Sequence, residues 1–193
     1  MKTLLIILCV SMALFILYKS VQNIERAFCV FKFRQIPFVP SAHVLRRAVI
    51  NEIQTQYPHA KTVMEIGAGY GGFARQIAGE TNATVYAIEN MPFSFAILRT
   101  CNFILRARTC IAIRADVFEY IRNMHKGIDI GIAYLGPEIN NRLKPYAKRF
   151  RVLITLDAPI RGMRPTRTVD LSRHGATRWN GVEYPHKLFI YES

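Results

Sequence analysis

The sequence predicts an α/β fold built on a mainly parallel, doubly wound sheet. From residue 41 onward, short apolar runs rich in Val and Ile alternate with segments of helical periodicity. This alternation is typical of right-handed crossover units on a parallel sheet. In addition, the apolar run Thr62–Ile66 ends in a glycine-rich turn over Gly67–Gly72, and a helical pattern follows. A turn of this kind after the first strand is typical of sheets that bind nucleotide-like cofactors.

The elements follow one another in a regular order. We expect a first helix that Ser41 caps and that ends at about Gln56, ahead of Pro58. The strands are expected at residues 62–66, 84–88, 109–115, 128–134 and 151–156, and the helices between them at residues 73–78, 92–106, 117–124 and 137–146. Residues 168–171 and 187–191 are also strand-like, and only a glycine-containing loop separates them. They are expected to form an antiparallel pair that closes the sheet.

The first part of the chain predicts a transmembrane helix. Residues 3–18 carry no charge and are almost all apolar, a length close to the roughly 20 residues that span a bilayer. The small residues of a signal-peptide cleavage site are missing, so an uncleaved anchor over residues 1–23 is favoured over a cleaved signal. Positive charges lie mainly after this segment, which predicts a single-pass protein with its domain on the cytoplasmic or mitochondrial matrix side. A linker over residues 24–40 would then precede the domain at residues 41–193.

The charge and the composition of the chain favour some classes of binding partner over others. The formal net charge of +13 predicts attraction to anionic lipid, acidic protein or nucleic acid. No added RNA-binding module and no Asn/Asp-Pro-Pro-aromatic element is present, so the lipid bilayer and a membrane-associated protein are favoured over nucleic acid. The four cysteines and five histidines lack the spacing of metal ligands, so no metal site is expected.

Three strand ends carry residues suited to a nucleotide-like cofactor, because ligands of such sheets bind outside the carboxyl ends of the strands. The glycine loop would hold the polar tail of the cofactor through Glu65, Gly67, Ala68, Gly69, Tyr70 and Gly71. Glu89 ends the second strand, where a carboxylate can accept both ribose hydroxyls, and Asn90 lies beside it. Asp116 ends the third strand and can accept from an adenine amino group, with Val117 next to it.

NAD and S-adenosylmethionine are the two cofactors to weigh. Gly67, Gly69 and Gly72 satisfy the dinucleotide pattern G-x-G-x-x-G, and Glu89 fits its ribose-binding acid. Three features favour S-adenosylmethionine. Glu65 is an acid where dinucleotide folds prefer an apolar residue, Asp116 supplies a carboxylate on the adenine side, and the chain has no length left for a separate substrate domain.

Residues 61–193 resemble the seven-strand class I methyltransferases, with Glu65–Gly72 as the first motif and Glu89 and Asp116 as the acids of the next two. A closer resemblance covers nearly the whole chain. The apolar N-terminal segment, the element Pro37-Phe38-Val39-Pro40-Ser41 and the later Tyr134-Leu135-Gly136-Pro137 are similar to the small membrane-anchored protein lysine methyltransferases, and to their prokaryotic relatives. Those enzymes act on the adenine nucleotide translocase and the ATP synthase c subunit, and usually carry an acid where this chain has Tyr70.

The resemblance implies an S-adenosylmethionine-dependent methyltransferase that modifies a lysine of a membrane-associated protein. Methylation of a small molecule or lipid is the alternative, as is a protein of this fold that binds at the membrane without turnover. Methyl transfer needs mainly alignment and desolvation, and a buried site next to the sulfonium favours a neutral amine. The sequence therefore names no dedicated base. Phe38 and Tyr134 are expected to line the methyl-transfer site, because ring faces attract cationic groups.

Overall fold

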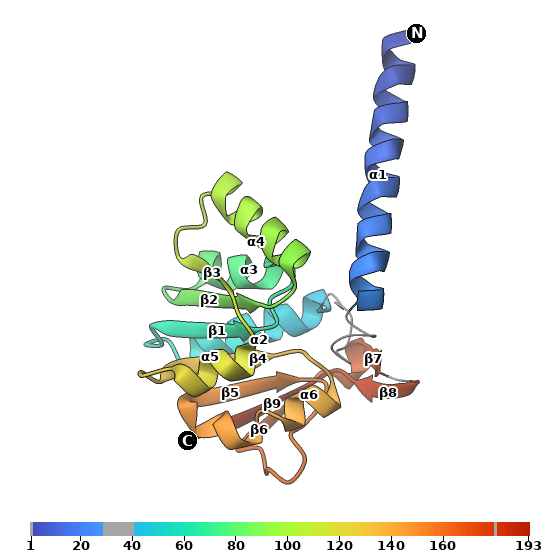
Figure 1. Ribbon diagram of the computed structural model, residues 1–193. Helices are drawn as coiled ribbons and strands as arrows, with labels where there is room; N and C mark the ends of the chain where they lie inside the picture. The colour runs from blue at the N-terminus through green and yellow to red at the C-terminus, as the bar shows by residue number, and fades with distance from the viewer. Residues whose placement is uncertain (1, 29–40, 180) are drawn as a thin grey trace. The chain divides into compact units, whose positions relative to one another are not determined.

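A computed structural model describes residues 2–28, 41–179 and 181–193 of the chain (Figure 1). The chain divides into two compact units, Met1–Val39 and Pro40–Ser193. The element Pro37–Pro40, with Phe38, lies outside the described residues. The role expected of Phe38 therefore stays a prediction.

The first unit contributes one long helix, α1 (Lys2–Phe28). Among the described residues, no helix combines the length and the apolar character that crossing a membrane requires. The predicted transmembrane anchor over residues 1–23 is therefore wrong, and so is the single-pass placement with the domain on the cytoplasmic or matrix side. The physical reason is length, since the uncharged run ends at Tyr18 and falls short of the roughly 20 apolar residues that a span needs.

The second unit is built on a seven-stranded sheet in the order β3-β2-β1-β4-β5-β9-β6. The strands are β1 (Thr62–Ile66), β2 (Thr84–Glu89), β3 (Cys110–Arg114), β4 (Ile128–Ala133), β5 (Phe150–Leu156), β6 (Arg167–Asp170) and β9 (Lys187–Glu192). Strands β1 to β5 pair in parallel, and β9 runs antiparallel between β5 and β6. The predicted α/β fold, with a mainly parallel sheet and an antiparallel C-terminal pair, is confirmed.

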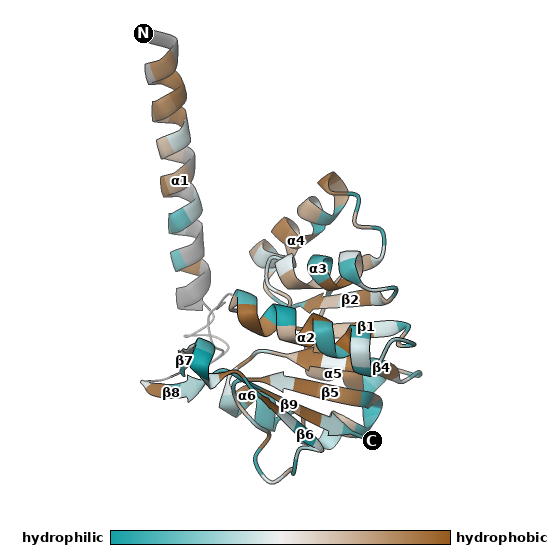
Figure 2. Ribbon diagram, turned by 180° about the vertical axis from the view of Figure 1, so that it is seen from behind, coloured by the Kyte–Doolittle hydropathy of each residue, from teal (hydrophilic) through white to brown (hydrophobic). Residues whose placement is uncertain are grey.

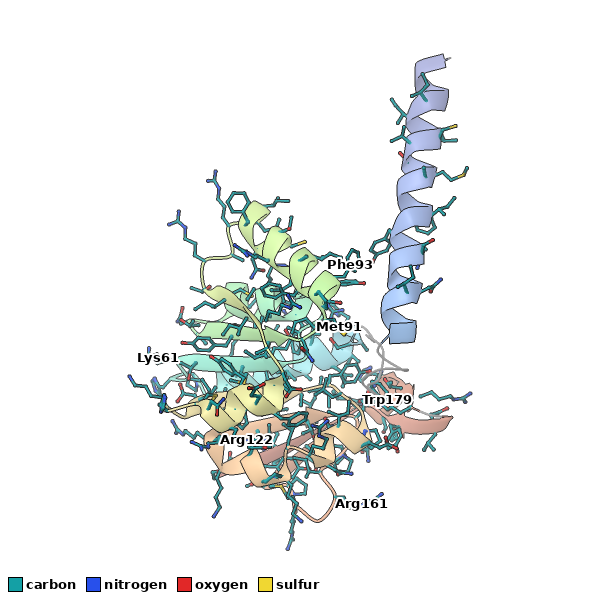
Figure 3. The ribbon with its side chains drawn as sticks, in the orientation of Figure 1. Lys61, Met91, Phe93, Arg122, Arg161 and Trp179 are labelled. Atoms are coloured by element: carbon teal, nitrogen blue, oxygen red, sulfur yellow. The ribbon has the colours of Figure 1, made fainter. Side chains whose placement is uncertain are left out.

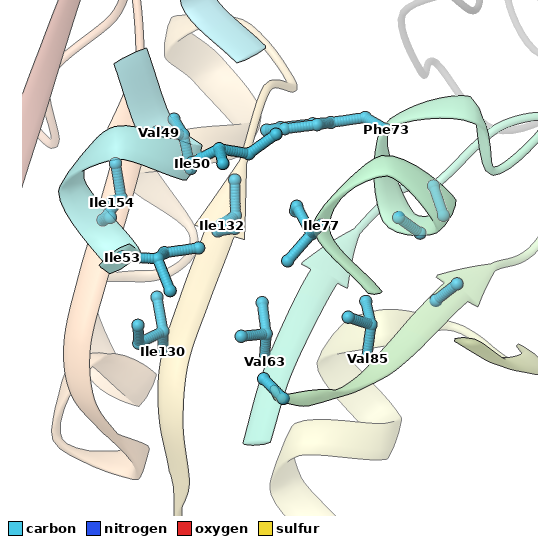
Figure 4. Close-up of a cluster of buried hydrophobic side chains, with 14 of the residues drawn as sticks. Val49, Ile50, Ile53, Val63, Phe73, Ile77, Val85, Ile130, Ile132 and Ile154 are labelled. Carbon is cyan, nitrogen blue, oxygen red and sulfur yellow. The ribbon is translucent and has the colours of Figure 1, made fainter. Parts of the chain in front are cut away.

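Helices pack against both faces of this sheet, and apolar residues concentrate on its central strands (Figure 2). One face is covered by α2 (His43–Gln56), α3 (Gly72–Glu80) and α4 (Pro92–Ile104), and the other by α5 (Val117–Asn123), α6 (Pro137–Asn141) and the 3-10 helix η2 (Lys144–Arg149). Figure 4 shows the first of these two cores, where Ile53 of α2 and Ile77 of α3 pack over Val63 and Ile130 of the central strands. All four side chains are at most 2% exposed, so the strands that carry the site rest on a rigid base.

Two local predictions are wrong. Ser41 does not cap α2, because Ala42 occupies the N-cap position without a side-chain hydrogen bond. The Ser41 carbonyl instead accepts hydrogen bonds from the Arg46 guanidinium at 2.9 and 2.8 Å. The helix expected over residues 137–146 is divided into α6 and η2. Pro145 explains the division, because proline lacks a backbone N–H and disfavours helical geometry in the residue before it.

A second, two-stranded sheet lies in the segment expected to be a loop. The short 3-10 helix η3 (Ser172–His174) is followed by a hairpin of β7 (Ala176–Trp179) and β8 (Val182–Pro185). Gly181, with φ +81°, supplies the left-handed backbone of the connecting turn. The hairpin brings Thr177 and Trp179 to the residue that follows β4.

Candidate active site

The glycine loop turns sharply between β1 and α3. Gly67, Gly69 and Gly71 have φ values of +75°, +54° and +71°, a left-handed conformation that residues with a Cβ rarely adopt. The loop is held against β2, because the amides of Gly67 and Ala68 donate to the Ile88 carbonyl at 3.0 and 2.9 Å. The loop therefore has a defined shape before any ligand arrives.

The end of β4 lies directly beside this loop. Strands β1 and β4 are in parallel register with Ile66 opposite Ala133, which places the following Tyr134 and Leu135 next to Gly67. A Cβ on Gly67 would stand 2.5 Å from Leu135 Cδ2. Gly67 thus lets the two strand ends approach closely.

Glu65 is buried beneath the loop near the end of β1. The residue is 9% exposed, and its Oε2 is buried without a hydrogen-bond partner. Burial raises the pKa of Glu65 to about 8, and the charge of Glu89 adds to the rise, while Arg46 and Arg75 oppose it. A buried neutral acid with an unpartnered oxygen can lose its proton when a cationic ligand group binds beside it, because the cation stabilises the carboxylate.

Glu89 ends β2 with its carboxylate turned into the loop. Oε2 accepts from the Gly69 amide and Oε1 from the Met91 amide, both at 2.7 Å. Glu89 is 8% exposed. The carboxylate therefore fixes the shape of the glycine loop, which sequence reasoning missed, and its contact with ribose hydroxyls stays a prediction. Asn90, partly buried, follows it at the same strand end.

Asp116 follows β3 and caps α5. Its Oδ1 accepts from the amides of Phe118 and Glu119 at 2.9 and 3.1 Å, a standard N-cap arrangement. The sequence predicted an adenine contact for Asp116, and the capping role was not foreseen. Val117 begins the helix and is partly buried, so the expected contact of both residues with a cofactor stays a prediction.

Tyr134 connects the sheet to the hairpin. Its hydroxyl lies 2.7 Å from Thr177 Oγ1, and its ring makes an edge contact with Trp179 at 5.4 Å between centroids. Burial raises the pKa of Tyr134 to about 12, so the phenol is neutral at physiological pH. Trp179 is 4% exposed, and its Nε1 has no hydrogen-bond partner. Figure 3 shows Trp179 at the opposite end of the sheet from Lys61, which precedes β1.

Sequence reasoning missed two further residues at this edge. Asp157 follows β5, and His186 precedes β9 and places its Nδ1 3.2 Å from each Asp157 carboxylate oxygen. Their exposed fractions are 2% and 5%. The sequence did carry a signal for Asp157, because this acid lies at the carboxyl end of its strand, as Glu89 and Asp116 lie at the ends of theirs.

The structure thus brings together the loop residues Glu65 to Gly71 with Glu89 and Tyr134 at neighbouring strand ends, and Asp116 at the next end along. These strand ends lie at the edge of the parallel sheet where ligands bind. The chain adds β2 and β3 on one side of β1 and β4 and β5 on the other, so the strand order reverses at this point.

No protein-family model and no curated protein sequence matches the chain. The chain is similar to solved structures with the same fold. An RNA methyltransferase from Salinibacter ruber in complex with S-adenosyl-L-homocysteine is 18% identical, with a TM-score of 0.64 over 80% of this chain and 93% of that one. A precorrin-6y C5,15-methyltransferase from Geobacter metallireducens is 13% identical, with a TM-score of 0.57 over 81% and 92%. A precorrin 8W decarboxylase from Methanobacterium thermoautotrophicum is 17% identical, with a TM-score of 0.56 over the same shares. The chain therefore has the Rossmann-like fold of these enzymes.

Proposed function

We propose that this protein is an S-adenosylmethionine-dependent methyltransferase. The observation that carries the proposal is the strand arrangement around the glycine loop. A dinucleotide-binding sheet has six parallel strands in the order 3-2-1-4-5-6. Here an antiparallel strand, β9, lies between β5 and β6. The RNA methyltransferase and the precorrin-6y methyltransferase share this fold, and the first of them holds S-adenosyl-L-homocysteine.

The residues at the strand ends fit such a cofactor. The buried carboxyl of Glu65, with its unpaired Oε2, suits the ammonium of a methionine moiety. The left-handed glycines keep side chains away from the path of the cofactor, and Glu89 and Asp116 offer acceptors for the ribose and the adenine. When bound, the cofactor supplies a sulfonium methyl group. The protein aligns the acceptor with that group and excludes water from it.

For the acceptor we propose a protein lysine. The support is the resemblance of the Tyr134–Pro137 segment together with the aromatic pair of Tyr134 and Trp179 beside the glycine loop. Aromatic ring faces attract an ammonium group, and they also hold the apolar stem of a lysine side chain.

The test is a transfer assay with methyl-tritiated S-adenosylmethionine and a total cell extract as acceptor mixture. After the reaction, the protein, nucleic acid and lipid fractions are separated and counted. We expect label in protein, and methyl-lysine after acid hydrolysis. Label mainly in RNA, in lipid or in a small-molecule product would contradict the lysine acceptor, while no transfer to any acceptor would contradict the methyltransferase activity itself.

A further inference from the structure

Four polar side chains from separate elements form a connected cluster beside the glycine loop. They are Tyr134 after β4, Asp157 after β5, Thr177 on β7 and His186 ahead of β9. The Tyr134 hydroxyl lies 2.7 Å from Thr177 Oγ1, and His186 Nδ1 lies 3.2 Å from both Asp157 oxygens. Asp157 lies close enough to Thr177 and Tyr134 to interact with both, because the Thr177 hydroxyl opposes the burial-driven rise in the pKa of Asp157 and the Asp157 carboxylate adds to the burial-driven rise in the pKa of Tyr134.

The Asp157 end of the cluster is held in an unusual conformation. Asp157 has φ +62°, which non-glycine residues seldom adopt and which is retained mainly where the geometry is needed. Its backbone is pinned to β9, since its amide donates to the Lys187 carbonyl at 2.8 Å and its Oδ1 accepts from the Lys187 amide at 3.2 Å. The carboxylate is thereby held against the start of β9.

Tyr134 is the member of the cluster that lies next to the glycine loop. Asp157 and His186 are buried, whereas Tyr134 and Thr177 are partly exposed, and Tyr134 follows β4 at the strand end beside Gly67. The His186 ring is also covered on one side, since a Cβ on Gly175 would lie 3.2 Å from its Nε2. A group bound beside the glycine loop would therefore reach the Tyr134 hydroxyl first.

We propose that Tyr134, Thr177 and Asp157 form a relay that removes the proton from the methyl acceptor, with His186 holding the carboxylate at its end. The inference rests on the proposed function and deepens it. Tyr134 is the catalytic residue, because it touches the acceptor. Thr177, Asp157 and His186 are positioning residues that act through it.

A lysine acceptor enters the site as an ammonium. One ammonium proton passes to the oxygen of Tyr134. At the same time the phenol proton of Tyr134 passes to the Thr177 oxygen, and the hydroxyl proton of Thr177 passes to the Asp157 carboxylate. This leaves a neutral amine whose electron pair forms the new carbon–nitrogen bond, while the pair of the breaking carbon–sulfur bond stays on sulfur. Once the product has left, the proton returns through Thr177 to the partly exposed Tyr134 hydroxyl and is released there to solvent. Burial raises the pKa of Asp157, against the opposing effect of Thr177 and His186, which makes the carboxylate a better proton acceptor.

Thr177 offers the sharpest test, because its hydroxyl can be removed or kept with little change in shape. Thr177→Val is isosteric and breaks the relay, whereas Thr177→Ser retains the hydroxyl. Thr168→Val makes the same chemical change on β6, at an exposed position outside the cluster. The readouts are the single-turnover rate of tritium transfer into extract protein at pH 7 and pH 9.5, and the dissociation constant of S-adenosylmethionine.

We expect Thr177→Val to lower the rate at pH 7 by about tenfold or more and to recover most of it at pH 9.5, where lysine loses its proton to solvent unaided. Thr177→Ser and Thr168→Val should stay within about threefold of the wild type at both pH values. All three variants should bind the cofactor as the wild type does. A Thr177→Val enzyme that is fully active, or that is equally impaired at both pH values, would overturn the relay while leaving the methyltransferase intact. A wild type that binds the cofactor but labels only nucleic acid, lipid or a small molecule would overturn the lysine acceptor and the relay, and one that labels no acceptor would overturn the methyltransferase activity as well.

The Asp157–His186 contact can be checked without turnover. A carboxylate only accepts hydrogen bonds, so His186 must carry its proton on Nδ1. Nitrogen-15 NMR of the imidazole, assigned with His186→Asn, should show that tautomer at pH 8. A proton found on Nε2 alone would contradict the orientation of the carboxylate on which the relay depends.

Discussion

The carboxylate of Glu89 accepts a hydrogen bond from the Gly69 amide at 2.7 Å and so joins the end of β2 to the glycine loop that follows β1. The second carboxylate oxygen accepts from the Met91 amide at the same distance. One side chain thus shapes the loop, and we propose that it also binds the ribose.

Glu89→Ala should weaken S-adenosylmethionine binding by roughly 1.5–3 kcal/mol, about ten- to over a hundredfold, because a charge-assisted acceptor is lost. The same change leaves two buried amides without their acceptor and should lower the free energy of unfolding of the cofactor-free protein by about 1–3 kcal/mol. Calorimetry and urea denaturation measure the two effects separately. A threefold or smaller change in affinity would mean that Glu89 serves the loop alone.

Glu65 should make stability depend on pH. Its pKa is about 8 in the folded protein, against an ordinary value of 4.5. Between these values the folded state holds a proton that the unfolded state has lost, so the free energy of unfolding falls as pH rises through this window. Glu65→Gln carries no charge at this position, so its free energy of unfolding should not fall in this way. It should exceed that of the wild type by roughly 2–4 kcal/mol at pH 8 and by little at pH 5.

Urea denaturation of both proteins at the two pH values checks this prediction, with Glu80→Gln as a control. Glu80 is a surface acid that pairs with Arg47, and its pKa is lowered by its hydrogen bonds to Gln76 and Arg47. An advantage of Glu65→Gln that is the same at pH 5 and pH 8 would show that Glu65 is ionised in the folded protein.

Gly67→Ala should destabilise the protein by roughly 1–2 kcal/mol and weaken cofactor binding, since a Cβ would face Leu135 and a left-handed φ of +75° is costly for alanine. Gly79→Ala is the matched control. That glycine lies in α3 with open space around it, and alanine there should stabilise the helix by about 0.5–1 kcal/mol. If both substitutions stabilise the protein, the loop conformation has been assigned incorrectly.

Arg167 and Glu52 join β6 to α2 through two parallel hydrogen bonds, and Glu52 is only 7% exposed. Arg167→Met would leave this carboxylate buried and unpaired, at a cost of roughly 1–3 kcal/mol in the free energy of unfolding. The double variant Glu52→Met/Arg167→Met removes the uncompensated charge and should recover most of the loss. A double variant less stable than Arg167→Met alone would contradict this account.

Much of the fold could be predicted from the sequence, because the patterns that specify each strand, turn and helix lie within short stretches of the chain. The apolar run Val63–Ile66 with the glycines after it specifies a strand, a tight turn and a helix within a dozen positions, and all three are present. The antiparallel closing pair was predictable for a similar reason, since its strands alternate and the sequence between them shows no α-helical pattern.

The failures have different physical causes. Ser41 is a good capping residue in isolation, but its carbonyl is engaged by Arg46 and Ala42 takes the cap position. The apolar segment before Lys19 has the composition of a membrane span without the length. The cluster of Tyr134, Thr177 and Asp157 joins residues far apart in the chain, so only the sheet register and the hairpin bring them together.

The central claim is that the glycine loop with Glu65 and Glu89 binds S-adenosylmethionine. Isothermal titration calorimetry of the full chain with S-adenosylmethionine, S-adenosyl-L-homocysteine and NAD tests it most directly, with Gly67→Ala in the same titrations. We predict one site per chain for the first two ligands, at least tenfold tighter than NAD, and weakened by the substitution. Tighter binding of NAD, or no binding of S-adenosylmethionine by the folded protein, would contradict the account.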